Sequence, residues 1–147
     1  MTRILSLGGG LQSSTILHLI DRGLIEPVKE AVFADTGDEP DYVYEYLEYL
    51  KKTVSTEITI VKSEIASSLK DAFLTRVESK NGKFRSLVEI PFFLTVKKTG
   101  KKGILDRQCS KYFKVLPINK YLRSKYKKCE VLIGFSTDEV FRIKPSR

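Results

Sequence analysis

The chain has 147 residues, of which 41% are hydrophobic, and its formal net charge at pH 7 is +8. A chain of this length can bury one core of ordinary size, so we expect a single domain over residues 1–147. No apolar run reaches the roughly 18 residues that span a bilayer, and the first residues do not form a signal-peptide pattern. These features argue against a membrane partner and predict a cytoplasmic protein.

The first predicted strand, residues 3–7, runs into a glycine-rich stretch over residues 6–14, which reads SLGGGLQSS. Glycines let the backbone adopt positive φ and approach a ligand closely, so that amide N–H groups at a helix start can face an anion. The hydroxyls of Ser13 and Ser14 add donors. The stretch predicts a phosphate cradle, although the same pattern also fits a turn that only joins a strand to a helix.

Apolar residues then recur at helical spacing and predict a helix over about residues 13–22, with Gly23 near its end. A short apolar strand over residues 31–34 stops at a second group of turn residues, Asp35-Thr36-Gly37. Pro40 opens the next helix. The buried stripe of that helix is predicted from residues at helical intervals, namely Val43, Tyr46, Leu47, Leu50 and Val54.

The middle of the chain changes character after a third strand and helix, predicted over residues 57–61 and 63–74. Between residues 76 and 107 the pattern dissolves into polar, glycine-containing turns around an apolar plug at residues 90–94. Stretches of this length without regular structure are uncommon in compact domains. We therefore interpret the segment at about 76–107 as a long functional loop or lid, with simple flexibility as the alternative.

The last predicted elements are a helix that starts at Pro117 and a strand over residues 130–133, which ends at Gly134. Four strands thus alternate with helices, an order that predicts an α/β fold with a parallel sheet and right-handed crossovers. Ligands of such sheets bind beyond the carboxyl ends of the strands. The glycine-rich stretch, the Asp-Thr-Gly turn and the segment after Ile133 are all expected at that edge.

Positive charge is concentrated in the C-terminal third. Residues 97–147 hold 15 Lys and Arg against 4 Asp and Glu, whereas residues 1–96 hold 11 against 14. A basic segment can attract nucleic acid, can surround the phosphates of a smaller ligand, or can form an ordinary solvated surface. Nucleic acid is therefore one partner that this third of the chain suggests.

The two cysteines, Cys109 and Cys129, are too few for a disulfide framework and lack the short paired spacing of a zinc site. Their number also excludes a cluster of iron and sulfur held by four cysteines of one chain. Cys129 precedes an apolar strand, so we expect it to be a buried thiol.

The glycine-rich stretch also carries a resemblance. Residues 8–13, GGGLQS, overlay the Ser-Gly-Gly-x-Asp-Ser loop of the PP-loop proteins, also called the adenine nucleotide α-hydrolase-like superfamily. Within it the chain most resembles the phosphoadenosine phosphosulfate (PAPS) reductase-like group. Gly8 stands where that loop usually has serine and Gln12 where it has aspartate. A Gly-Gly-Gly-x-Gln-Ser form is similar to that of small phage and prokaryotic relatives.

Three further segments match the group in the same order. Residues 33–37, followed by Glu39 and Pro40, resemble the Asp-Thr-Gly segment that lies near the nucleotide. Residues 107–110 with Lys114 and Pro117 resemble a segment that carries an arginine, one or two cysteines, a lysine and a proline. The run Gly134-Phe135-Ser136, with Glu139 and Arg142, resembles the element that contacts the sulfate or phosphate end of the ligand.

The resemblance implies a three-layer α/β/α fold with a mainly parallel sheet, described as HUP-like or Rossmann-like. Relatives continue with at least one more strand and helix, which we expect this chain to lack, and a second copy could cover the open edge or face as a homodimer. The implied ligand is ATP or a related adenine nucleotide. Its expected contacts are Ser6, Gly8, Gly9, Gly10, Gln12, Ser13, Ser14, Asp35, Thr36 and Gly37.

The resemblance also implies sites for charge. Arg107, Lys114 and Arg142 are expected to bind phosphate or sulfate oxygens. Asp35 is expected to accept a ribose hydrogen bond or to help hold Mg²⁺, while capping the helix at Pro40 is its ordinary structural role. No catalytic residue is identified, and Cys109 and Arg107 are the candidates.

Three functions follow from the resemblance. The first is an ATP pyrophosphatase, a transferase or hydrolase that cleaves between the α- and β-phosphates and adenylates a substrate. The second is a binding module for a nucleotide or nucleic acid that has lost the reaction, which Gln12 favours. The third is a nucleic-acid modification component that acts with a partner. A true PAPS reductase is disfavoured, because such enzymes need a cysteine near the C-terminus and none follows Cys129.

Overall fold

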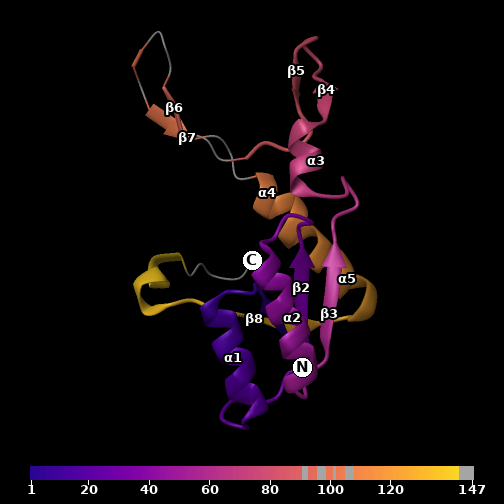
Figure 1. The fold of residues 1–147 in the computed structure, drawn as a ribbon, viewed down its shortest axis with the longest axis vertical. Coiled ribbons are helices and arrows are strands. Elements are labelled where there is room, and N and C mark those ends of the chain that lie inside the picture. Colours follow the sequence, from indigo (N-terminus) through magenta and orange to yellow (C-terminus); the bar gives the residue numbers. More distant parts are fainter. Residues whose placement is uncertain (91–92, 96–98, 101, 105–107, 143–147) are drawn as a thin grey trace. The chain divides into compact units, whose positions relative to one another are not determined.

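The computed structural model describes residues 1–90, 93–95, 99–100, 102–104 and 108–142. The described residues form one four-stranded sheet in the order β3-β2-β1-β8 and two separate two-stranded ribbons (Figure 1). The strands of the sheet are β1 (Thr2–Leu7), β2 (Glu30–Asp35), β3 (Ile58–Lys62) and β8 (Cys129–Ile133). Among these residues no helix has both the length and the apolar character needed to cross a bilayer.

The sheet is parallel where its pairing is defined. β1 pairs in parallel with β2, with Leu7 opposite Phe33, and in parallel with β8, with Ser6 opposite Ile133. Every residue of β2 is buried, which explains why the middle of this strand, residues 31–34, is a continuous apolar run rather than an alternating one. The predicted α/β fold with a mainly parallel sheet is confirmed.

Helices α1 (Leu11–Asp21) and α2 (Asp41–Thr53) pack on one face of this sheet. Their apolar stripes meet the strand side chains in a core that contains Leu5, Leu7, Leu17, Ile20, Ala31, Phe33, Val43, Leu47 and Leu50. The helical spacing read from the sequence of α2 is confirmed. α1 begins two residues before the predicted start, because the helix follows Gly10 directly.

Helix α3 covers only Leu69–Leu74, so the prediction of a helix from residue 63 is wrong for its first six residues. Serine side chains explain the difference. Ser63 accepts a hydrogen bond from the Ile65 N–H and donates one to the carbonyl of Tyr112, which holds the segment in a turn. Ser68 caps the helix by accepting from the Asp71 N–H.

The segment predicted as a loop contains regular structure. β4 (Arg76–Glu78) pairs antiparallel with β5 (Phe84–Ser86), and β6 (Phe93–Thr95) pairs antiparallel with β7 (Lys102–Ile104). The sequence pattern missed both ribbons because strands of three residues are too short for a visible alternation. A role of this segment as a lid stays a prediction.

The helix predicted from Pro117 begins earlier. α4 (Gln108–Ser110), the π-helical turn η1 (Lys111–Val115) and α5 (Leu116–Lys125) follow one another without a break. Pro117 cannot donate a helical hydrogen bond, and the wider turn lies directly before it, with the Leu116 N–H bonded to the Lys111 carbonyl. Proline is common at helix starts, but Pro117 lies inside a helical segment. A 3-10 helix, η2 (Thr137–Arg142), follows β8.

The chain divides into two compact units. The first comprises Met1–Phe33, Pro40–Ile60 and Leu122–Arg147, and the second comprises Ala34–Glu39 and Val61–Tyr121. The first unit contains the core of the sheet and helices α1 and α2. The second has a smaller core of Ala72, Val88 and Phe113. A single functional domain over the whole chain stays a prediction.

Candidate nucleotide site

The glycine loop, residues 8–10, joins β1 to α1 in the first unit. Gly9 has a φ of 70°, in the left-handed region that favours glycine. A Cβ atom at Gly9 would lie 3.1 Å from Cγ1 of Val43 and 3.4 Å from a ring atom of Phe33. The loop therefore needs glycine at this position both for its backbone conformation and for its close packing on the core.

Helix α1 starts without a cap. Its N-cap residue is Gly10, no side-chain cap bond is formed within the described residues, and the first turn contains no acidic residue. The first intrahelical bond runs from the Ser14 N–H to the Gly10 carbonyl at 3.2 Å. The amide groups before Ser14 are left at the positive end of the helix dipole, an arrangement that attracts an anion.

The two serines of this turn have different roles. The Ser13 hydroxyl accepts from the Gly8 N–H at 3.0 Å and donates to the Gly10 carbonyl at 3.4 Å, so it holds the loop against the helix. Ser14 is 5% exposed, and its hydroxyl oxygen has no hydrogen-bond partner among the described residues. A buried hydroxyl without a partner costs about 1–3 kcal/mol. Ser14 is thus a donor that a bound group can satisfy.

Gly134, the residue after β8, packs against the same turn. A Cβ atom there would lie 2.8 Å from the backbone carbon of Gln12 and 2.8 Å from the backbone nitrogen of Ser13. Only glycine fits so close to another backbone. The structure therefore brings the glycine loop and the start of the predicted Gly134-Phe135-Ser136 element together.

The Asp-Thr-Gly turn follows β2 and belongs to the second unit. Asp35 is buried, and its carboxylate accepts from the Gly37 N–H at 2.8 Å and lies 3.1 Å from Nζ of Lys62. The N-cap residue of α2 is Pro40, and a capping role of Asp35 stays a prediction. The bond to the Gly37 N–H fixes the turn that contains Asp35. Lys62 was not predicted as a site residue from the sequence. Its position at the carboxyl end of a strand could have indicated it.

Lys114, predicted to bind phosphate, lies in the same unit. Its Nζ is 3.0 Å from Oε1 of Glu39, which also accepts from the Thr36 hydroxyl at 3.1 Å. Glu39 is mostly buried, whereas Lys114 is partly exposed. The pair joins the lysine to the turn. It also offsets part of the positive charge that a phosphate would meet.

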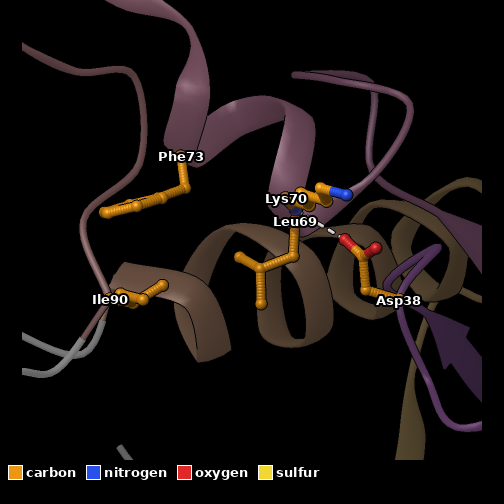
Figure 2. A pocket seen from close by; sticks show the side chains of 5 residues that line it. All are labelled: Asp38, Leu69, Lys70, Phe73 and Ile90. Carbon is orange, nitrogen blue, oxygen red and sulfur yellow. Dashed lines mark hydrogen bonds between the residues drawn. The ribbon is translucent and has the colours of Figure 1, made fainter.

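A pocket of about 320 Å³ lies beside this turn (Figure 2). Leu69, Phe73 and Ile90 supply apolar walls, and the Asp38 carboxylate accepts from the backbone N–H of Lys70 at its other side. The lining suits an apolar group. None of these five residues was predicted as a site residue, since they come together only through α3 and the segment after β5.

Comparison with known proteins gives the same family as the resemblance of the glycine loop. The family model of the phosphoadenosine phosphosulfate reductase domain matches residues 2–142. The chain belongs to this family. The PAPS reductase domain is part of the PP-loop, adenine nucleotide α-hydrolase-like superfamily, so the resemblance read from the four segments is confirmed. No curated protein matches the chain at a significant level.

The remaining predicted site residues of this PAPS reductase domain lie in several elements, and some are outside the described residues. Ser6 is partly buried in β1, and Gln12 is partly buried in the first turn of α1. Cys109 in α4 is a partly buried free thiol. Arg107 lies outside the described residues. Arg142 ends η2, and its side chain is also outside them.

Cys129 is only partly buried, so the expectation of a buried thiol is wrong; it is the first residue of β8, at the edge of the described sheet. Over the part of the chain that the structure describes, no three His, Cys, Asp or Glu side chains gather to hold a metal ion. The PAPS reductase family binds adenine nucleotides, and Mg²⁺ at Asp35 stays a prediction.

Proposed function

We propose that this chain binds an adenine nucleotide, ATP or a PAPS-like nucleotide, with its phosphates at the glycine loop and the first turn of α1. The observation that carries the proposal is the buried Ser14 hydroxyl, which has no partner in the described part of the chain and lies at a helix start whose N-cap is glycine. An uncapped start and an unsatisfied buried donor at one turn favour the same kind of ligand, an anion that accepts hydrogen bonds. Family membership gives the ligand class.

The proposed reaction is adenylation. An oxygen of the acceptor substrate attacks the α-phosphorus of ATP, a new P–O bond forms, and the bond to the bridging oxygen breaks, so that pyrophosphate leaves with the electron pair. The amides before Ser14 would stabilise the charge on the leaving pyrophosphate. The charged groups that we propose to bind the phosphate oxygens are Lys114, Arg107 and Arg142.

Magnesium fits this proposal only in a limited way. Both carboxylate oxygens of Asp35 already have partners, Gly37 and Lys62, and no cluster of ligands exists among the described residues. Mg²⁺ commonly binds through one or two carboxylates together with substrate phosphates. Asp35 is therefore the proposed protein ligand of an ion that arrives with the nucleotide and offsets phosphate charge.

Gln12 favours a second candidate, a module that binds the nucleotide without turnover. Relatives usually place a carboxylate at this loop position, and Gln12 offers a neutral amide in the same first turn of α1. A neutral side chain can hydrogen-bond to a phosphate but supplies neither a charge for a metal ion nor a base. Binding is thus better supported than any reaction.

Two measurements test these proposals. Calorimetric titration with ATP, AMP, adenosine phosphosulfate and PAPS should show binding that Ser14→Ala weakens by about 10- to 100-fold, since a hydrogen bond to a charged group is lost. Thr15→Ala is the matched control, because the exposed Thr15 hydroxyl bonds to the Leu11 carbonyl of its own helix. No binding at millimolar nucleotide would contradict the ligand class.

The second measurement follows AMP and pyrophosphate after incubation with ATP and Mg²⁺. Release that is lost in Ser13→Ala and in Arg107→Gln supports adenylation. Tight binding without release favours the second candidate.

A further inference from the structure

The ribbon formed by β4 and β5 is a hairpin of the second unit (Figure 1). Its turn is closed by a bond of 2.9 Å from the Gly82 N–H to the Ser79 carbonyl, and the Ser79 N–H bonds to the Lys83 carbonyl at 2.8 Å. Gly82 has a φ of 70°, as a three-residue hairpin loop requires. The residues at the turn are therefore held in a defined place before any partner binds.

The base of the hairpin is anchored to the smaller core. The Val88 N–H bonds to the Ala72 carbonyl, and the Leu87 N–H bonds to the Thr75 carbonyl. Ala72 and Val88 are fully buried together with Phe113. The exposed end of the hairpin thus projects from a fixed base, and its surface side chains can change without loss of the core.

The turn end combines an exposed aromatic ring with unpaired cations. Phe84 is 70% exposed and lies opposite the exposed Glu78, and Lys80, Lys83 and Arg85 are exposed with no ion-pair partner in the described residues. In the basic third of the chain, Lys114, Lys120 and Lys125 each pair with a carboxylate, whereas Arg123, Lys127 and Lys128 are exposed and have no ion pair among the described residues.

We propose that the turn end of this hairpin, Lys80, Lys83 and Phe84, binds single-stranded nucleic acid. A strand crossing the turn would place phosphates at the two lysines and stack one base on the Phe84 ring. Exposed aromatic rings beside cations bind single strands in this way, because every unpaired base offers a π face. A duplex keeps its bases paired and offers Phe84 no such face. The proposal does not depend on the nucleotide site at the glycine loop.

The test is fluorescence anisotropy with labelled 12-nucleotide oligo(dT) and oligo(U), measured between 50 and 200 mM salt. We expect Phe84→Leu to weaken binding by about 10- to 100-fold with little change in salt dependence, and Phe84→Tyr to retain binding. Lys83→Gln should reduce the slope of log K against log salt by about 0.7, the value for one lost phosphate contact on a single strand.

Matched controls come from α2. Tyr42 is as exposed as Phe84, at 70%, and Lys52 is exposed as well, so Tyr42→Leu and Lys52→Gln should leave oligonucleotide binding unchanged. Ser14→Ala should also leave it unchanged, which separates this surface from the nucleotide site.

Several results would overturn the proposal. The first is absence of binding at 50 mM salt, and the second is an equal loss in the α2 controls, which would indicate diffuse attraction by net charge. The third is equal affinity for a duplex together with no effect of Phe84→Leu. Competition by polyglutamate as strong as that by oligo(dT) would point to an acidic protein partner instead.

Discussion

Ser14 gives the sharpest prediction at the scale of single residues. Its buried hydroxyl lacks a partner among the residues that the structure describes, so Ser14→Ala removes an unsatisfied polar group and should not lower the stability of the ligand-free protein. We expect the unfolding midpoint without nucleotide to stay the same or rise. The stabilisation that saturating ATP adds should fall at the same time, because it depends on the ligand's affinity. Thermal unfolding with and without ATP measures both. A ligand-free variant that is clearly less stable would mean that Ser14 has a structural partner.

Gly134 leads to a second prediction at this scale. The Cβ of Gly134→Ala would lie 2.8 Å from backbone atoms of Gln12 and Ser13, which cannot move aside as a flexible side chain can. We expect a loss of about 1–3 kcal/mol in the free energy of unfolding, together with weaker nucleotide binding. Gly103→Ala is the control, since no atom of the described residues lies within 4 Å of its Cβ position. Urea unfolding of both variants measures the loss. Equal stability of Gly134→Ala and the wild type would contradict the close approach of Gly134 to Gln12 and Ser13.

At the scale of elements, the contact between the C-terminal end of α5 and strand β2 can be tested by varying the pH. Glu30 at the start of β2 is 1% exposed and accepts hydrogen bonds from Thr59, Lys125 and Tyr126. Burial raises the pKa of Tyr126 above its ordinary value of 10.0, and the bond to Glu30 raises it further. The folded state therefore holds the Tyr126 proton more tightly than the unfolded state. The resulting stability is fully present below pH 10 and is lost as the pH rises through the folded-state pKa.

Tyr126→Phe removes this donor and should lower the free energy of unfolding by about 1–3 kcal/mol at pH 7. The gap between wild type and variant should shrink as the pH rises above 10. Urea unfolding at pH 8, 10 and 11 measures the gap, with Tyr42→Phe as an exposed control. A gap that stays constant to pH 11 would show that Tyr126 does not stabilise Glu30 through its proton.

The helices and strands with a long hydrophobic pattern were the ones that the sequence predicted correctly. β2 and α2 were predictable because an apolar run and a helical stripe of several turns leave little ambiguity. The start of α3 was not, since the hydrogen bonds of Ser63 and Ser68 compete with helix formation. Pro117 was misleading because a π-helical turn accommodates it.

For the whole molecule, the glycine loop and the sheet edge that it shares with the segment after Ile133 were predictable, but the individual contacts were not. Three consecutive glycines after a strand mark the loop in the sequence, and Gly9 has the positive φ that they suggest. Long-range contacts leave no local pattern. The approach of Gly134 to α1 and the pairing of Lys114 with Glu39 join residues far apart in the chain, and both required the structure.

The open edge of the sheet bears on the predicted homodimer. Among the described strands β8 is the last on its side of the sheet. Val131 and Ile133 are 37% and 58% exposed although they are opposite Ile4 and Ser6 of β1. Ile4 on the same face is fully buried, so this face is covered over β1 and open over β8. Exposed apolar edge strands tend to associate, and a second copy is the partner that the protein always has at hand.

We therefore expect the wild type to be a dimer and Ile133→Lys to be a monomer, because a charged side chain on the edge strand prevents close pairing. Sedimentation equilibrium at several protein concentrations measures the mass, and circular dichroism checks that the variant keeps its helix content. Ile60→Lys is the matched control on β3, the opposite edge of the sheet, where Ile60 is 38% exposed. It should remain dimeric. A wild type that stays monomeric at about 100 μM, well above the concentrations at which stable dimers form, would contradict the homodimer.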